Sequence, residues 1–225
     1  MSTTITVQGS AGTWVDAERG TLSISASFDG PEREDVFSQA TATANAVAAL
    51  IEPLVDAGAG PVTRWSSDRV HVWSSRPWND QGKQLPPVYH ASIGARAEFS
   101  DPDALARVIE QLAVEDGVTL GSVEWDLTEQ RRREVEDAVR ADAVADAVHK
   151  AQTYARAAGI GTPVVNAIAD PGMLGDGSAG GGAPVPMQRT AFAGAMDASP
   201  ESGSLTLSPD RIHVTASVDV RFQVG

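Results

Sequence analysis

The chain has 225 residues, of which 30 are acidic and 17 are basic, and its formal net charge is −13. Because a field of this sign repels phosphate groups, the composition argues against a nucleic acid partner. The absence of cysteine excludes disulfides, thiolate metal sites and cysteine nucleophiles. No segment approaches the ~20 apolar residues of a membrane span, and the opening MSTTITVQG has no signal-peptide pattern, so we expect a cytoplasmic protein.

Alternating polar and apolar residues predict strands at 3–8 and 20–28, and a helix follows from Glu32 to Leu54 or Asp56. The next elements are strands at 62–75, 88–99 and 121–129 and a helix at 100–117, with a polar tip at 76–87 between the first two strands. The order from residue 20 onward is β-α-β-β-α-β, as in the ferredoxin-like arrangement of two helices on one face of an antiparallel sheet. The predicted fold class is therefore α+β.

The second half begins with a long alanine-rich helix, Arg131 to Ala158, and a short strand at 162–170. Residues 170–209 contain eight glycines and five prolines and predict a flexible loop. The final segment, 211–224, alternates as a long strand, which we expect to return to the main sheet. We expect residues 1–225 to form a single domain.

Motifs for catalysis or cofactor binding are weak. Residues 175–180 match G-x-G-x-x-G, but GGAPVP follows where a dinucleotide site needs a helix, so the segment is interpreted as loop and no cofactor is expected. No G-x-S-x-G elbow is present, and we identify no catalytic residue.

The histidines offer only a weak case for a metal site. His71, His90 and His213 fall in predicted strands, but no H-x-H or H-E-x-x-H spacing supports zinc. Asp142, Asp146 and His149 share a face of the long helix and could bind a metal or relay a proton. We favour a solvated face, in which Asp146 pairs with Lys150, and predict no metal.

Aromatic residues provide the candidate interaction sites. By strand parity, Trp65, His71 and Trp73 lie on one face, and Trp78 lies in the polar tip. An exposed tryptophan at a tip can anchor a protein contact, although a tip that folds back would bury it.

The long helix carries rows of small residues. One row has the helical period and is almost wholly alanine: Ala138, Ala141, Ala145, Val148, Ala151, Ala155 and Ala158. A second row is Ala143, Ala147, Ala151 and Tyr154. Alanine buries little area but permits close backbone approach, so we expect a sheet or another helix against this surface.

This helix resembles the signature helix of the SIMPL domain family. The matching positions are Ala143, Val144, Asp146, Ala147, Lys150, Ala151, Ala155 and Gly159. The opening strand with Ile5, Val7 and Gly9 and the strands at 88–99 and 211–224 are also similar to the family's, so the resemblance covers nearly the whole chain. It implies an α+β domain of unknown function. Many relatives begin with an export signal, which this chain lacks.

The resemblance also implies a non-catalytic role, because no member is a firmly established enzyme. Some relatives form ring-like or channel-like oligomers, others are linked to stress tolerance, and a mammalian relative binds a kinase. We therefore expect a homo-oligomer or a protein that binds a protein partner. The alternative is a small-ligand binder or an uncharacterised enzyme, with residues 170–209 as a lid and His71, His90 and Trp73 in one pocket.

Overall fold

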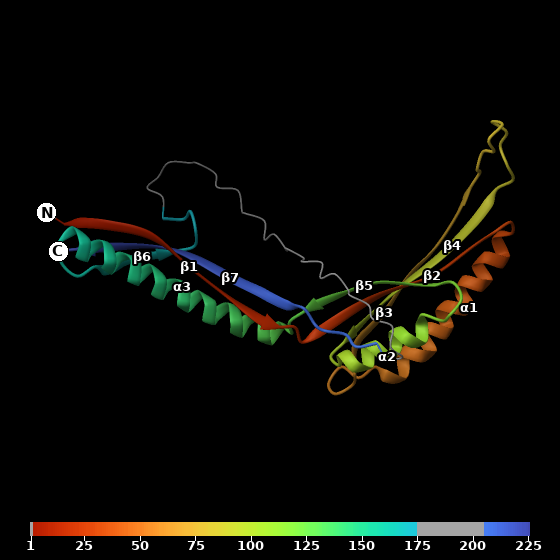
Figure 1. The fold of residues 1–225 in the computed structure, drawn as a ribbon, viewed down its shortest axis with the longest axis horizontal. Helices are drawn as coiled ribbons and strands as arrows, with labels where there is room; N and C mark the ends of the chain where they lie inside the picture. Colours follow the sequence, from red (N-terminus) through yellow and green to blue (C-terminus); the bar gives the residue numbers. More distant parts are fainter. Residues whose placement is uncertain (1, 175–204) are drawn as a thin grey trace. The chain divides into compact units, whose positions relative to one another are not determined.

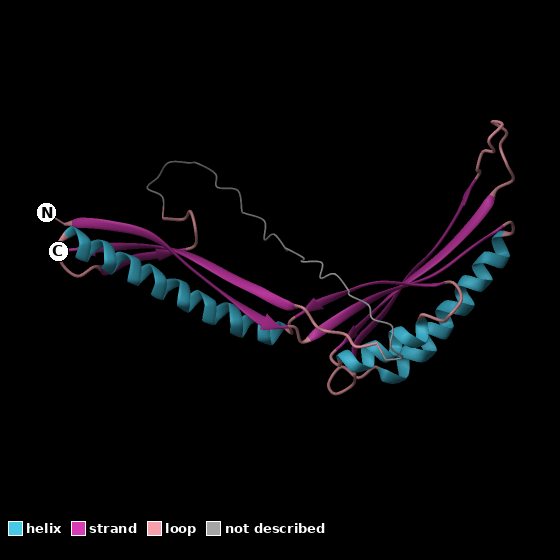
Figure 2. Cartoon of the chain, in the orientation of Figure 1, coloured by secondary structure: helices cyan, strands magenta, loops and turns pink. Residues whose placement is uncertain are grey.

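The computed structural model describes residues 2–174 and 205–225, and these form two compact units (Figures 1 and 2). The first, the βαββαβ unit, contains residues 16–128 and 205–212. The second, the long-helix unit, contains residues 2–15, 129–174 and 213–225 among those described. Most of the predicted loop at 170–209, including the glycine motif at 175–180, lies outside the described residues.

The βαββαβ unit has the predicted order of elements. They are β2 (Arg19–Gly30), α1 (Arg33–Ile51), the 3-10 turn η1 (Glu52–Leu54), β3 (Val62–Ser75), β4 (Val88–Phe99), α2 (Pro102–Leu112) and β5 (Val118–Asp126). The strands form a four-stranded sheet in the order β3-β4-β2-β5, and each neighbouring pair is antiparallel. This is the strand order of a ferredoxin-like sheet, and the predicted α+β class is confirmed.

Strand alternation determines which face of this sheet is buried. Leu22, Ile24 and Ala26 of β2 are buried and stand opposite Ala97, Ala95 and Ile93 of β4. Helices α1 and α2 cover this face (Figure 1). Each fully buried large side chain contributes about 1.5–3 kcal/mol relative to an exposed one, so this face holds the unit together.

The helices of this unit are shorter than predicted. Pro53 cannot continue an α-helix, so α1 ends at Ile51 and the chain tightens into the 3-10 turn. Helix α2 begins with Asp101 as its cap, whose Oδ1 accepts from the Asp103 N–H at 2.9 Å. It ends at Leu112 rather than 117, and the next residues form turns that lead to Gly117 at φ +77°.

The long-helix unit has its own sheet. Its elements are β1 (Thr3–Asp16), α3 (Glu129–Ala158), β6 (Val164–Ala169) and β7 (Arg211–Val224). The three strands lie in the order β1-β7-β6, so the expectation that the last strand returns to the main sheet is wrong. Strand β7 instead pairs with a partner of equal length, because β1 continues eight residues beyond the predicted end at residue 8.

Helix α3 packs against this sheet along a seam of small side chains. The buried side chains follow one another at intervals of four residues: Val135, Val139, Ala143, Ala147, Ala151 and Ala155. The first predicted row is therefore wrong, since Ala138, Ala141, Ala145 and Ala158 are exposed. A row at intervals of four is inclined to the helix axis, and long twisted strands produce an inclined line of contact.

The seam brings the backbones of β1 and α3 unusually close at Gly9. A β-carbon on Gly9 would lie 2.8 Å from Ala147 Cβ and still closer to the Ala143 carbonyl oxygen. Ala147 and Ala151 share a core cluster with Val7, Val220 and Phe222. The residues that resemble the SIMPL signature thus form the contact between the helix and the sheet.

Two other signature residues bind the backbone of β1. Asp146 Oδ2 accepts from the Ser10 N–H at 2.9 Å and pairs with Lys150 Nζ at 2.7 Å, while Lys150 donates to the Gln8 carbonyl at 3.0 Å. The hydrogen bond from Lys150 and then that from Ser10 lower the pKa of Asp146. We call Asp146, Lys150 and their contacts on β1 the edge clip, because β1 is the last strand on its side of the sheet.

None of the helices in the described part of the chain has the length and apolar character needed to cross a membrane.

We predict that Gly9→Val lowers the free energy of unfolding by about 1–3 kcal/mol, because the new side chain meets backbone atoms of α3 that cannot move aside. Urea denaturation measures this change. The control is Ser10→Ala, an exposed neighbour whose backbone N–H keeps its bond to Asp146, and it should change the value by less than about 0.5 kcal/mol. Equal stability of Gly9→Val and the native protein would contradict the close contact.

We predict that the stability lost in Asp146→Asn depends on pH. A carboxyl whose pKa is lowered by folding stabilises the folded state above its ordinary value of 3.8, and this contribution disappears as the pH falls through the lower folded value. The difference in Tm between native and Asp146→Asn protein should therefore be largest above about pH 5 and shrink toward pH 3. The exposed Asp142 gives the control, Asp142→Asn, and a difference that grows on acidification would disprove the assignment.

Candidate functional site

The four-stranded sheet has a second face, which its helices leave open (Figure 1). Small polar residues occupy the centre of this face, since Ser25, Ser27 and Ser92 alternate with the core residues of β2 and β4. Their Oγ atoms lie 3.0 Å apart and bond to one another. The centre of the face is therefore flat and hydrophilic.

A chain of hydrogen bonds crosses this face where three strands end. Asp29 of β2 stands opposite His90 of β4, and Asp29 Oδ1 lies 2.6 Å from His90 Nδ1. The other ring nitrogen of His90, Nε2, lies 2.8 Å from the hydroxyl of Ser75, the last residue of β3. A serine hydroxyl, an imidazole and a carboxylate are thus connected in series.

Hydrogen-bonding chemistry assigns the tautomer of the neutral His90 ring. An ionised carboxylate only accepts hydrogen bonds, so Nδ1 carries the hydrogen that is donated to Asp29. Nε2 then has a free lone pair and accepts from the Ser75 hydroxyl. We call Asp29, His90 and Ser75 in this state the Ser–His–Asp chain.

Two further aromatic residues lie beside this chain. Trp73 is opposite His90 in the strand register, and their rings stack with centroids 5.0 Å apart. His71 lies two residues before Trp73 on β3, with ring centroids 4.9 Å apart. The structure therefore brings together His71, Trp73 and His90, although on an open sheet face and with Trp73 still 43% exposed.

Trp65 lies on the opposite face, so its predicted position beside His71 and Trp73 is wrong. The register of β3 against β4 shifts between Ser67 and Val70, where β3 contains one extra residue. Such a bulge reverses the alternation that follows it. Trp65 before the bulge therefore packs against the core, while Val72 after it takes the core-facing position.

Trp78, the other predicted contact residue, is 66% exposed in the tip between β3 and β4. The tip is ordered by Asn79, whose side-chain oxygen accepts from the N–H groups of Gln81 and Lys83 at 3.1 and 2.8 Å. Its role as an anchor for a protein partner stays a prediction.

The remaining histidines lie on the long-helix unit. His149 is exposed on α3, where its predicted neighbour Asp146 is engaged in the edge clip. His213 stacks on Trp14 of β1 with ring centroids 4.5 Å apart. Among the residues that the structure describes, no group of three histidine or carboxylate side chains is placed to hold a metal ion.

A pocket lies near the same end of the four-stranded sheet as the Ser–His–Asp chain. It is lined by Glu32, Arg33, Glu34, Phe37 and Tyr89, around the start of α1. His71, Trp73 and His90 do not line it, so this pocket differs from the one expected for a small-ligand binder. The predicted lid over a cleft falls mostly on residues 175–204, outside the described part of the chain.

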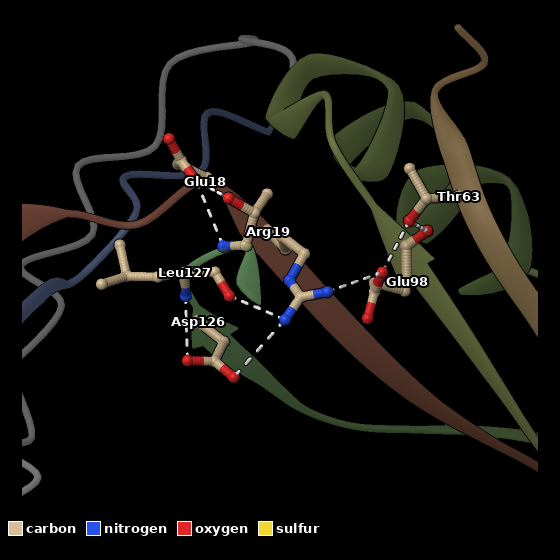
Figure 3. Close-up of polar contacts among 7 residues, drawn as sticks. Glu18, Arg19, Thr63, Glu98, Asp126 and Leu127 are labelled. Atoms are coloured by element: carbon tan, nitrogen blue, oxygen red, sulfur yellow. Dashed lines mark hydrogen bonds and ion pairs between the residues drawn. The ribbon is translucent and has the colours of Figure 1, made fainter. Parts of the chain in front are cut away.

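A cluster of charged residues occupies the other end of the sheet and holds strands together (Figure 3). Arg19 Nη1 contacts Glu98 Oε1 at 3.3 Å, and its Nη2 donates to the Leu127 carbonyl at 2.7 Å. Glu98 also accepts from the Thr63 hydroxyl at 2.7 Å. Because these charges are engaged within the protein, the cluster connects β2, β3, β4 and the end of β5 and leaves little capacity for a ligand.

Asp29 and Ser75 were not identified from the sequence. Predicted strands correctly paired 62–75 with 88–99, but nothing in the residue pattern gives the register that sets Ser75 diagonal to His90. The strand at 20–28 was also predicted to end one residue before Asp29. A hairpin register together with the bulge in β3 would have been the necessary signal.

Comparison with known proteins gives one result for the whole chain. The SIMPL family model, described as "Protein of unknown function (DUF541)", matches residues 5–222. No match was found among curated proteins. Because the family match spans both compact units and includes the helix of the signature residues, the chain belongs to the SIMPL family.

Proposed function

We propose that the protein is a non-enzymatic, self-assembling protein and that two copies join through strand β6. The observation that carries this proposal is the difference between the two edges of the three-stranded sheet. The edge formed by β1 is bonded to α3, whereas the edge formed by β6 carries exposed apolar residues. A link to stress tolerance, as in some relatives, remains an expectation.

Strand β6 has a strand partner on one side only, β7, within the part of the chain that the structure describes. An edge strand presents backbone N–H and C=O groups that can pair with another chain. Natural edges are often protected by charged residues, but β6 has the sequence VVNAIA with no charge and no proline. It is therefore suited to pairing with a second strand.

The apolar face of β6 continues the core of its sheet. Val165 and Ile168 stand opposite the buried Phe222 and Val220 of β7, yet they are 43% and 53% exposed. A second β6 placed alongside would set its own valine and isoleucine beside these two. Burying such side chains fully contributes about 1.5–3 kcal/mol each, which favours association.

The edge clip limits the form of the assembly. Asp146 and Lys150 occupy a backbone N–H and C=O of β1 at Ser10 and Gln8, so another strand cannot use them. Pairing of β6 with β1 of the next copy, which would give rings or filaments, is therefore opposed. Pairing of β6 with β6 is self-complementary and closes as a two-fold dimer.

We predict that the double substitution Val165→Lys and Ile168→Lys converts the dimer to a monomer, because two lysines on an edge strand oppose pairing with the same strand of another copy. Light scattering with native mass spectrometry at micromolar concentrations measures the mass. The matched control is Val114→Lys, an apolar residue that is 82% exposed in the turn after α2, and it should leave the dimer intact. A native protein that is strictly monomeric would refute the proposal.

A further inference from the structure

We propose that the Ser–His–Asp chain makes Ser75 a nucleophile that accepts an acyl group from small activated esters, aryl esters in particular. The chain lies in the βαββαβ unit, and the proposed dimer strand lies in the other unit. The inference is therefore independent of self-assembly, and each can fail while the other stands.

The three side chains have the connections that nucleophilic catalysis requires. A serine hydroxyl is a weak nucleophile until a base within about 2.6–3.2 Å removes its proton. His90 Nε2 lies 2.8 Å from Ser75 Oγ, and Asp29 at 2.6 Å from Nδ1 holds the ring in the tautomer that can act as this base. Asp29 is thus a positioning residue, and Ser75 and His90 carry the reaction.

The surroundings keep the base in place and leave the nucleophile accessible. The His90 side chain is mostly buried, and Trp73 stacks on its ring. Ser75 is exposed at the end of β3, so a substrate carbonyl reaches its hydroxyl from solvent. Asp29 is largely exposed as well, which weakens its electrostatic effect on the ring and points to modest rates.

The reaction follows from these positions. Ser75 Oγ forms a bond to the carbonyl carbon of the ester while its proton passes to His90 Nε2. The bond between that carbon and the leaving oxygen breaks, and the proton on Nε2 is transferred to the leaving phenol or alcohol. Water, activated by the same nitrogen, then hydrolyses the serine ester and releases the acid.

Aryl esters suit this site for two reasons. A phenolate is a good leaving group, so the reaction does not depend on a deep pocket that would hold the substrate. The exposed part of Trp73 offers an aromatic surface beside the nucleophile, and aromatic rings attract one another in offset or edge-on contact.

The first test is the reaction of the purified protein with a fluorophosphonate probe, followed by peptide mass spectrometry. We expect an adduct on Ser75 that Ser75→Ala abolishes and that Asp29→Asn or His90→Gln slows about 10²-fold, the scale of general base catalysis. Ser27→Ala and Ser92→Ala are the controls, because these hydroxyls lie on the same face and bond to each other rather than to His90. An adduct that is absent, or unchanged in His90→Gln, overturns the proposal.

A second test does not depend on stabilising a tetrahedral intermediate. Because the chain has no cysteine, Ser75→Cys introduces a single thiol, and Ser27→Cys gives a matched single thiol. A neighbouring imidazole favours the thiolate, so we expect iodoacetamide to alkylate Ser75→Cys about tenfold faster than Ser27→Cys. Additional Asp29→Asn should reduce this difference if Asp29 orients the ring. Equal rates for the two single thiols would show that His90 does not activate this position.

Discussion

The close contact between β1 and α3 determines how the long-helix unit is built. Helix α3 has few large apolar side chains, and its buried row is mostly alanine, so bulk does not hold it to the sheet. Instead the absence of a side chain at Gly9 lets the two backbones approach, and dispersion contacts accumulate along the seam. The approach also brings Asp146 and Lys150 within reach of the β1 backbone. One contact therefore decides both where the helix lies and which edge of the sheet is protected.

Register has a similar influence in the βαββαβ unit. The extra residue in β3 moves His71 and Trp73 to the open face while Trp65 stays in the core. Without the bulge, Trp73 would face the helices, and His90 would lose the ring that stacks on it. The Ser–His–Asp chain depends on this register too, because Ser75 follows Trp73 by two residues and so shares its face.

Most of the fold could be predicted from the sequence because its elements are strongly periodic. The strands at 62–75, 88–99 and 211–224 have the predicted bounds, since each alternates clearly or ends at proline, glycine or serine. The sheet to which β7 belongs could not be predicted, because alternation states which residues face inward but not which strand lies beside them. The inclined seam of α3 was missed for a related reason: alanines on several faces of the helix make different rows equally plausible until the twist of the sheet selects one.

The residues that carry the family resemblance are engaged in structure. Gly9, Ala143 and Ala147 permit the close approach, and Asp146 and Lys150 form the edge clip, so none of them is free to bind a substrate or a partner. A match based on such positions specifies a shape and is compatible with different activities on that shape. The features on which the two proposals rest, the open edge of β6 and the Ser–His–Asp chain, lie outside these positions. Function in this chain is therefore to be sought in what the shared scaffold leaves exposed.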